Sequence, residues 1–349
     1  MPAAATFLPT GAILHSLTVG GRNIVLNFNT EDAYISTHNP CHFGATIGRV
    51  ANRIKDARIN ELSGAAWELE KNDGKNSLHG GVEGWGKRRW EKIDDDHDDA
   101  KAGKETYRLR SGHLEEGFPG EVEVTVAYTV TEKEGKVEVD MEYGARLVGE
   151  EVQETVVNVT NHSYFNLSGL PTIEGTEVTL STNLHLPLDP GGIPVGNSAA
   201  PYPGIAANTP FVLGPPGEPD FDDCFVFADA HADPASVPID TRGLPLRVCG
   251  SFFHGSSGVK LEVRSTEPAL QFYTGKYVDV PAQEDGTPAR LNRAGFCVEP
   301  SRFVDAVNRE EWRGMVVLRK GEVYGSRIVY SAWVEKKKAV DAVYRRGPG

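Results

Sequence analysis

Two neighbouring stretches with alternating side chains constrain the fold of this chain more than any other feature. In residues 122–130 every second residue is valine or tyrosine, and residues 137–143 repeat the pattern with valine, methionine and tyrosine. The sequence Glu-Lys-Glu-Gly lies between them, at 132–135. Successive side chains of a strand point to opposite faces, so the pattern predicts an antiparallel hairpin with one buried face.

Strand-length segments recur along the rest of the chain, and no segment shows a sustained helical period. Residues 13–26 are split by Gly20-Gly21, which predicts two strands joined by a tight turn. The proline- and glycine-rich stretch 187–219 is expected to form long loops that cross a sandwich. We therefore expect an all-β fold in one domain, with a core from about residue 11 to 333 and a frayed basic tail. The other expected strands are 177–180, 259–263, 270–273 and 328–333.

Charge and composition exclude several classes of protein. The chain has 349 residues and a formal net charge of −13, so it offers no basic surface for nucleic acid. Its four cysteines lie far apart without a Cys-x-x-Cys pair, and we expect free, mostly buried thiols. No apolar stretch is long enough to cross a bilayer, so we expect no membrane partner.

The start of the chain and three glycosylation-type triplets favour a cytoplasmic location. The first ten residues contain no lysine or arginine and no long apolar run, so they do not resemble a secretory signal. Triplets beginning at Asn158, Asn161 and Asn166 surround His162, where glycans would crowd the imidazole. We expect a monomer or a weak dimer in the cytoplasm.

Residues 158–169 place the most informative histidine of the chain among β-forming residues. If this segment is a strand, Asn161 and His162 point to opposite faces, and only one of them can look into a pocket. A buried histidine held by neighbouring amides is the alternative interpretation.

Three other polar segments contain candidate binding or catalytic groups. Residues 43–54 combine glycines with Arg49, Asn52 and Arg53, which could also be surface positions on a helix. His79 is followed by two glycines and two nearby tryptophans, a combination that suits a sugar. Glu299 follows three strand-type residues and precedes a proline, where a strand leaves a sheet, although a surface carboxylate beside a turn is the alternative.

The acidic run at residues 94–99 suggests a calcium loop at first sight. It lacks the glycine and the terminal glutamate that such a loop requires. We interpret residues 94–104 as a solvated hairpin tip.

Taken together and in order, these motifs resemble the aldose 1-epimerases, or galactose mutarotases, over nearly the whole chain. The resemblance implies a single-domain, galactose-mutarotase-like supersandwich of large antiparallel sheets. It also implies an enzyme without cofactor or metal that interconverts the α and β anomers of free hexoses such as galactose and glucose. The segments that carry the resemblance are 44–54, 76–81, 161–167, 221–222, 271–275, and Glu299 with 305–308.

The same resemblance implies roles for seven residues. Glu299 would be the general base and His162 the general acid. Family members often have a histidine after the aspartate, whereas this chain has Asp223 and Cys224, which leaves open which aspartate faces the sugar; we favour Asp222. The residues that would hold the sugar are Asn52, Arg53, His79, Asp222 and Gln271.

The chemistry of anomerisation requires one base and one acid. Ring opening removes a proton from the C1 hydroxyl while another reaches the ring oxygen. We expect Glu299 to be ionised at neutral pH and neighbouring charge to hold up the pKa of His162. The two groups are expected on opposite sides of one pyranose.

Three other functions fit part of the pattern. A hexose-6-phosphate 1-epimerase would need several arginines in the pocket, for which Arg49 and Arg53 are available. A non-catalytic carbohydrate-binding protein could keep the fold without the reaction. A glycoside hydrolase would need a carboxylate pair, such as Asp222 with Glu299.

Overall fold

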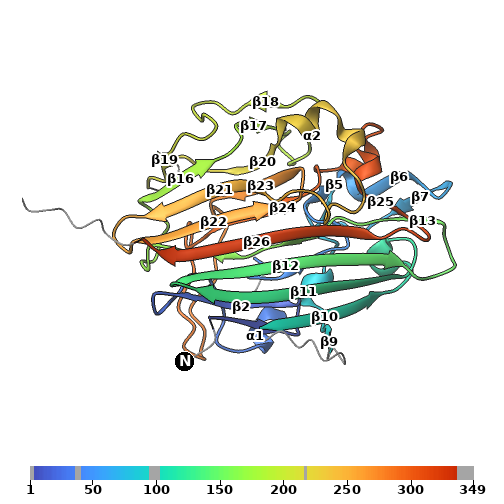
Figure 1. Cartoon of the computed structure of the whole chain (residues 1–349). Helices are drawn as coiled ribbons and strands as arrows, with labels where there is room; N and C mark the ends of the chain where they lie inside the picture. Colours follow the sequence, from blue (N-terminus) through green and yellow to red (C-terminus); the bar gives the residue numbers. More distant parts are fainter. Residues whose placement is uncertain (1–3, 36–40, 94–102, 216–217, 336–349) are drawn as a thin grey trace, which may run out of the picture.

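The structure is a computed structural model that describes residues 4–35, 41–93, 103–215 and 218–335. The acidic run at 94–99 and the basic tail therefore lie outside the described residues. Within them, large antiparallel sheets dominate, as the sequence predicted, and Figure 1 shows the long strands side by side. No helix in the described parts has the length and hydrophobicity that a membrane crossing requires.

A nine-stranded antiparallel sheet forms the larger layer of the molecule. Its order is β19-β16-β21-β22-β26-β12-β11-β10-β9. The strands are β19 (Phe211–Val212), β16 (Thr176–Leu180), β21 (Arg247–His254), β22 (Val259–Ser265), β26 (Tyr324–Val334), β12 (Lys136–Leu147), β11 (Val122–Lys133), β10 (Lys104–Ser111) and β9 (Glu91–Ile93).

A six-stranded antiparallel sheet, in the order β15-β24-β23-β20-β17-β18, forms the second layer. Its central strands carry several of the predicted site residues. The strands are β15 (Tyr164–Phe165), β24 (Phe296–Ser301), β23 (Ala269–Tyr273), β20 (Asp222–Val226), β17 (Leu184–His185) and β18 (Ala200–Pro201).

Smaller sheets and short helices complete the fold. A three-stranded sheet contains β1 (Ala5–Leu8), β2 (Ile13–Val19) and β3 (Arg22–Asn23). The two-stranded sheets pair β4 (Thr46–Ile47) with β14 (Thr160–Asn161), β5 (Arg53–Ile54) with β8 (Ser77–Leu78), β6 (Arg58–Leu62) with β7 (Ala65–Glu68), and β13 (Glu154–Val156) with β25 (Val317–Arg319). The α-helices are α1 (Asp32–Ile35) and α2 (Ala228–Ala232), and the 3-10 helices are η1 (Lys55–Ala57), η2 (Trp85–Lys87), η3 (Glu115–Gly117), η4 (Pro234–Ser236), η5 (Ala306–Asn308) and η6 (Arg313–Met315).

The predicted hairpin is confirmed as β11 and β12. The two strands pair in continuous register from Val122 to Lys133, and the valines at alternate positions are buried except Val130, which is partly buried. Glu134 and Gly135 form the turn, both with positive φ, as a two-residue hairpin turn of this kind requires. The alternation therefore fixes both the strands and their buried face.

The two strands predicted on either side of Gly20-Gly21 are confirmed as β2 and β3, which pair with each other. The second strand is short because the chain after Asn23 turns away and pairs Val25 with Phe165 through a single bridge. A helix, which was an open alternative for residues 43–54, is wrong. The structure has the short strands β4 and β5 there, because the glycines permit close backbone packing: a Cβ at Gly44 would lie 2.3 Å from the Leu14 carbonyl oxygen.

The main core lies between the two layers and determines which face of β24 remains free. Phe252 of β21 stacks on Phe296 of β24 with ring centroids 4.6 Å apart, and Phe165 meets Tyr330 edge-on at 5.0 Å. Since side chains alternate along β24, Phe296 and Val298 face this core, whereas Cys297 and Glu299 face the other side. The pocket described below lies on that other side.

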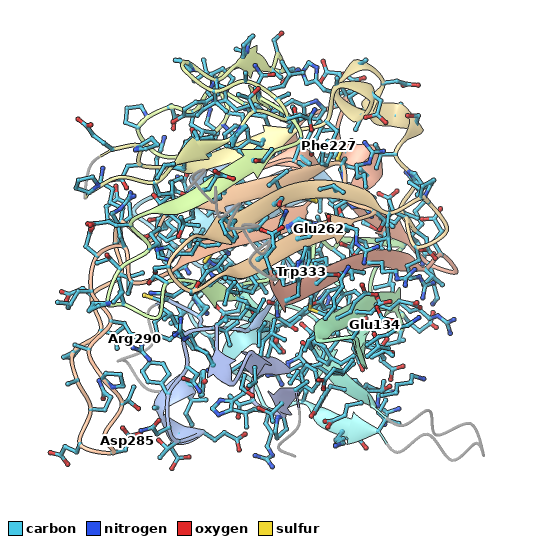
Figure 2. All side chains as sticks on the ribbon, turned by 60° about the vertical axis from the view of Figure 1, so that its left-hand side comes forward. Glu134, Phe227, Glu262, Asp285, Arg290 and Trp333 are labelled. Atoms are coloured by element: carbon cyan, nitrogen blue, oxygen red, sulfur yellow. The ribbon has the colours of Figure 1, made fainter. Side chains whose placement is uncertain are left out.

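The outer face of the nine-stranded sheet is polar and charged. On β22, Glu262 lies between the buried Leu261 and Val263, so its side chain points outward, as Figure 2 shows. Its carboxylate lies 3.5 Å from the Arg264 guanidinium in a partly exposed ion pair. Glu262 lies in a different sheet from Gln271 and Glu299 and does not line the pocket described below.

Candidate active site

Three neighbouring strands of the six-stranded sheet bring polar side chains to one face. Gln271 on β23 pairs directly with Glu299 on β24, and Asp222 on β20 pairs with Tyr273. The Gln271 amide nitrogen donates a 2.7 Å hydrogen bond to an Asp222 carboxylate oxygen. These residues share a face because directly paired residues point to the same side of a sheet, and Gln271 and Tyr273 lie two positions apart on β23.

The same alternation separates the two adjacent aspartates. Asp223 points to the opposite face from Asp222, where its carboxylate lies 3.7 Å from the His185 ring. Burial raises the pKa of Asp223, and the hydrogen bond that its carboxylate accepts from the Asp222 backbone N–H partly opposes this rise. The preference for Asp222 as the residue that faces the sugar therefore agrees with its position in the pocket.

His162 is held between β14 and β15 by its backbone and by the side chain before it. Its N–H donates to the Ala45 carbonyl, and its own carbonyl accepts from the Gly44 N–H. Asn161 points away and donates its amide to the Gly44 carbonyl at 2.9 Å. The prediction that only one of these two neighbours faces a pocket is therefore confirmed, and Asn161 is the structural partner.

The third wall of the pocket consists of Asn52, Arg53 and His79, on the segments around β5 and β8. The Asn52 N–H donates to Nδ1 of His79 at 3.3 Å, and the His79 N–H donates to the Asn52 carbonyl. The Arg53 guanidinium forms a 2.7 Å ion pair with Asp73. These contacts fix the orientation of the side chains at the pocket edge.

Three pocket residues adopt a backbone conformation that is unusual for side chains other than glycine. His42, Asn52 and His79 have φ values of 55°, 58° and 55°. A residue with a Cβ is sterically strained in the left-handed region, and such strain is often found at functional sites. The strained backbone of this wall is therefore a further indication that the pocket is functional.

All seven predicted site residues line one cavity of about 250 Å³. This volume suits a small molecule such as a single sugar ring. The prediction did not include several other residues of the lining. These are Cys41, His42, Asn72, Leu78, Tyr164, Tyr273 and Tyr277.

The alternation of the strands could have identified one of these additional residues, Tyr273, and one residue behind the cavity, Cys297. Tyr273 lies two positions after Gln271, and Cys297 lies two positions before Glu299, so each shares the face of a residue that was predicted. Tyr273 lines the cavity, and Cys297 lies behind His162. The position of His42 depends on a turn that the sequence pattern did not indicate.

The imidazole and the carboxyl group lie side by side, and the expectation that they flank a pyranose from opposite sides is not met. The Nε2 atom of His162 is 3.5 Å from an Oε2 atom of Glu299. The reason is that β24 and the segment after β14 converge at this point, where β15 pairs with β24. Both groups therefore approach a ligand from the same edge.

Burial sets the proton affinity of this pair. It raises the pKa of Glu299 well above its usual range, and the charge of Asp222 raises it further. It lowers the pKa of His162 to about 4. These directions are opposite to the expected ionised carboxylate and protonated imidazole, because the cavity wall removes water from both groups. These directions favour a neutral carboxyl group beside a neutral imidazole, and the pair rather than either residue titrates.

The same region contains the one group of described residues arranged closely enough to suggest a metal. Ligand atoms of His79, His162 and Glu299 lie within 4.8 Å of one another. However, burial lowers the pKa of His79 well below its usual value, and its Nδ1 atom accepts the Asn52 N–H. The neutral ring must then carry its proton on Nε2, where it can donate to a ligand but cannot bind a cation.

Arg49 has a structural role and does not face the pocket. Its fully buried guanidinium donates to the Pro119, Gly120, Ser111 and Gly112 carbonyls. The possibility that it sits on the surface of a helix was therefore wrong, and it is not available for a phosphate group. Among the described residues that line the cavity, Arg53 is the one permanent cation.

All four cysteines are free and buried, as predicted. Burial raises the pKa of Cys224 and Cys249 to about 12, and raises that of Cys297 well above its usual value. These thiols are therefore protonated at neutral pH and act as small buried side chains.

Comparison with known proteins identifies the family of this chain. A family model described as aldose 1-epimerase matches residues 3–331. The galactose mutarotase of Bos taurus is 35% identical over 305 residues, which cover 86% of this chain and 81% of that protein. The bifunctional protein gal10 of Schizosaccharomyces pombe is 36% identical over 332 residues, but this chain spans only 43% of its length.

Solved structures show the same fold. The GalM/aldose epimerase homologue from C. elegans superimposes with a TM-score of 0.79 at 24% identity, covering 95% of this chain and 96% of that chain. The galactose 1-epimerase from Lactobacillus acidophilus gives a TM-score of 0.72 at 20% identity, covering 95% and 92%. With the family match over nearly all of its length, this chain belongs to the aldose 1-epimerase family.

Proposed function

We propose that this chain interconverts the α and β anomers of free hexoses such as galactose and glucose by general acid–base catalysis. One observation carries the proposal: an imidazole and a carboxyl group lie 3.5 Å apart in a cavity lined by all five residues expected to hold a sugar. Family membership and the 35% identity to a galactose mutarotase support it.

The side-by-side arrangement suits the reacting carbon. In a cyclic aldose, C1 bears both the ring oxygen and the hydroxyl that loses its proton. Two groups at one edge of the sugar can therefore each reach one of these neighbouring oxygens. We assign Glu299 as the base that receives the C1 hydroxyl proton and His162 as the acid that protonates the ring oxygen.

Proton transfer in this assignment begins from the ionised form of the pair. Sugar hydroxyls that donate to Glu299 replace the water lost on burial and stabilise the carboxylate, so the shared proton moves to His162. When the ring opens, Glu299 gains a proton and His162 loses one, which leaves a neutral carboxyl group and a neutral imidazole. After rotation about C1–C2, the two groups exchange roles and the ring closes on its other face.

The remaining polar groups are suited to hold the sugar. The amide nitrogen of Gln271 donates to Asp222, and its buried amide oxygen has no hydrogen-bond partner among the described residues. It is therefore ready to accept from a hydroxyl. His79 offers a fixed Nε2–H donor, and Arg53 adds charged donors at the edge of the cavity.

The alternative functions are less well supported. A 6-phosphate would meet Arg53, which already pairs with Asp73, and would lie near the carboxylates Asp222 and Glu299. For glycoside hydrolysis, Asp222 would have to act on the scissile bond, yet it accepts the Gln271 amide. A binding protein without catalysis does not require the adjacent acid and base.

Several further properties are part of the proposal. We propose one domain, with a core from about residue 11 to 333, because the family model matches residues 3–331 without interruption. We also propose a monomer or weak dimer in the cytoplasm with no nucleic-acid partner. The net charge of −13 supports the last point.

Polarimetry tests the proposed function directly. Freshly dissolved α-galactose and α-glucose should approach their equilibrium rotation faster with the protein than in buffer alone. Glucose 6-phosphate, measured in parallel by NMR of its anomeric protons, should be turned over much more slowly. A rate equal to buffer for both free sugars would refute the proposal, and faster turnover of the phosphate would favour the phosphate-specific alternative.

A further inference from the structure

The strand that carries Glu299 also carries a second group in contact with the catalytic imidazole. Cys297 lies two residues before Glu299 on β24, so both side chains point to the same face. The Sγ atom of Cys297 is 3.6 Å from Nδ1 of His162, and the carboxyl oxygen of Glu299 is 3.5 Å from Nε2. One strand therefore contacts both ring nitrogens of His162.

The chemistry of proton transfer restricts what the Nδ1 contact can be. For Nε2 to give and take protons, a neutral His162 must keep its hydrogen on Nδ1 and leave Nε2 with a lone pair. If Nδ1 instead accepted a hydrogen bond, Nε2 would carry the hydrogen permanently and could not act as a base. A sulfur atom is a weak acceptor and can receive the Nδ1–H.

His79 in the same cavity shows the opposite arrangement. The backbone N–H of Asn52 donates to its Nδ1 atom, which fixes the hydrogen on Nε2. Because an amide N–H can only donate, His79 is a permanent donor toward the ligand. The two neighbouring imidazoles, whose ring centroids lie 5.0 Å apart, thus differ in the group placed behind Nδ1.

We propose that Cys297 is a positioning residue of the reaction: its sulfur accepts the Nδ1–H of His162 and keeps Nε2 free for proton transfer with Glu299 and the sugar. This role rests on the proposed interconversion of hexose anomers and on the geometry of β24. The Tyr164 hydroxyl donates to the same sulfur and lowers the pKa of Cys297 against the larger rise that burial causes. The sulfur is thus an acceptor for this second neighbour as well.

Two variants at Cys297 and one matched control separate this role from packing. Cys297→Ala removes the acceptor, whereas Cys297→Ser retains one. Cys249→Ala removes an equally buried thiol in the main core, away from His162. We expect Cys297→Ala to lower kcat for galactose about 3- to 10-fold with little change in KM, the loss expected for one hydrogen bond. Cys297→Ser and Cys249→Ala should stay within about 2-fold of the parent protein.

A measurement of the ring tautomer gives a readout that packing alone would not change. Long-range ¹H–¹⁵N NMR on histidine-labelled protein distinguishes Nδ1–H from Nε2–H forms. We expect His162 to be Nδ1–H in the parent and in Cys297→Ser, with a mixture of both forms in Cys297→Ala. If Cys297→Ala does not fold, Cys297→Val fills the space without an acceptor and replaces it in both measurements.

Two results would overturn the inference. The first is an Nε2–H form of His162 in the parent protein. The second is a Cys297→Ala or Cys297→Val variant with unchanged kcat and an unchanged tautomer. The NMR measurement needs no sugar, so a parent protein that fails to accelerate anomerisation would refute the proposed function while still deciding the tautomer.

Discussion

Replacing Glu299 by glutamine is the sharpest test of the catalytic pair. The amide has the shape of the carboxyl group and is equally able to form hydrogen bonds, but it cannot receive the C1 hydroxyl proton. General acid–base steps contribute about 10²- to 10⁴-fold, so Glu299→Gln should lower kcat by that factor, or about 3–5 kcal/mol in the barrier. KM should change little because the other cavity residues still hold the sugar.

The structure also predicts that this variant remains folded. Glu299 is only 3% exposed, and burial raises its pKa. The unfolded carboxyl group ionises more readily than the buried one, so the parent loses stability as the pH rises above the unfolded value, and an amide avoids that loss. The melting temperature of Glu299→Gln at neutral pH should therefore equal or exceed that of the parent.

The assay is polarimetry at saturating α-galactose, with the buffer rate subtracted and Tm measured in parallel. Glu262→Gln, on the outer face of β22, is the matched control and should keep the parent rate (Figure 2). Full anomerisation by a folded Glu299→Gln protein would show that this carboxyl group is not a proton carrier.

Three further predictions follow from the protonation and packing of the structure. Since burial lowers the pKa of His162 to about 4 and raises that of Glu299 in the free protein, kcat/KM should be flat near neutrality, fall near pH 4 when a second proton binds, and fall at alkaline pH when the shared proton leaves; a steady rise through neutrality would contradict this. Asp222→Asn should raise the KM for galactose about 10-fold or more, whereas Asp223→Asn should change it little, and equal effects would contradict the assignment. Arg302→Met should lower the free energy of unfolding in urea by about 3–5 kcal/mol, because it leaves Glu267 buried without its partner, and adding Glu267→Gln should recover part of the loss.

The regular part of the fold was predictable from local pattern. Alternation alone gave the hairpin of β11 and β12, and short apolar runs gave most of β16, β22, β23 and β26. Such patterns succeed because a strand with one buried face must place its apolar residues at every second position. The second strand of the β2–β3 hairpin is shorter than its apolar pattern suggests because a long-range bridge from Val25 to Phe165 draws the chain away after Asn23.

The site was predictable as a set of residues but not as a geometry. The motifs named seven side chains that do line one cavity. They did not show that Arg49 turns inward to four carbonyl groups, or that His162 and Glu299 lie next to each other on the same side of the cavity. These facts depend on how distant segments meet, and a sequence motif records only which side chains are present.

The left-handed residues of the cavity wall set a limit on how this protein can adapt to heat. Each of His42, Asn52 and His79 adopts a backbone conformation that costs an L-residue about 1 kcal/mol. Glycine at these positions would relieve about 3 kcal/mol in total, a large share of the net stability of a typical domain. Selection for thermal tolerance alone would thus remove side chains that face the ligand, so at these three positions heat resistance and sugar recognition are in direct competition.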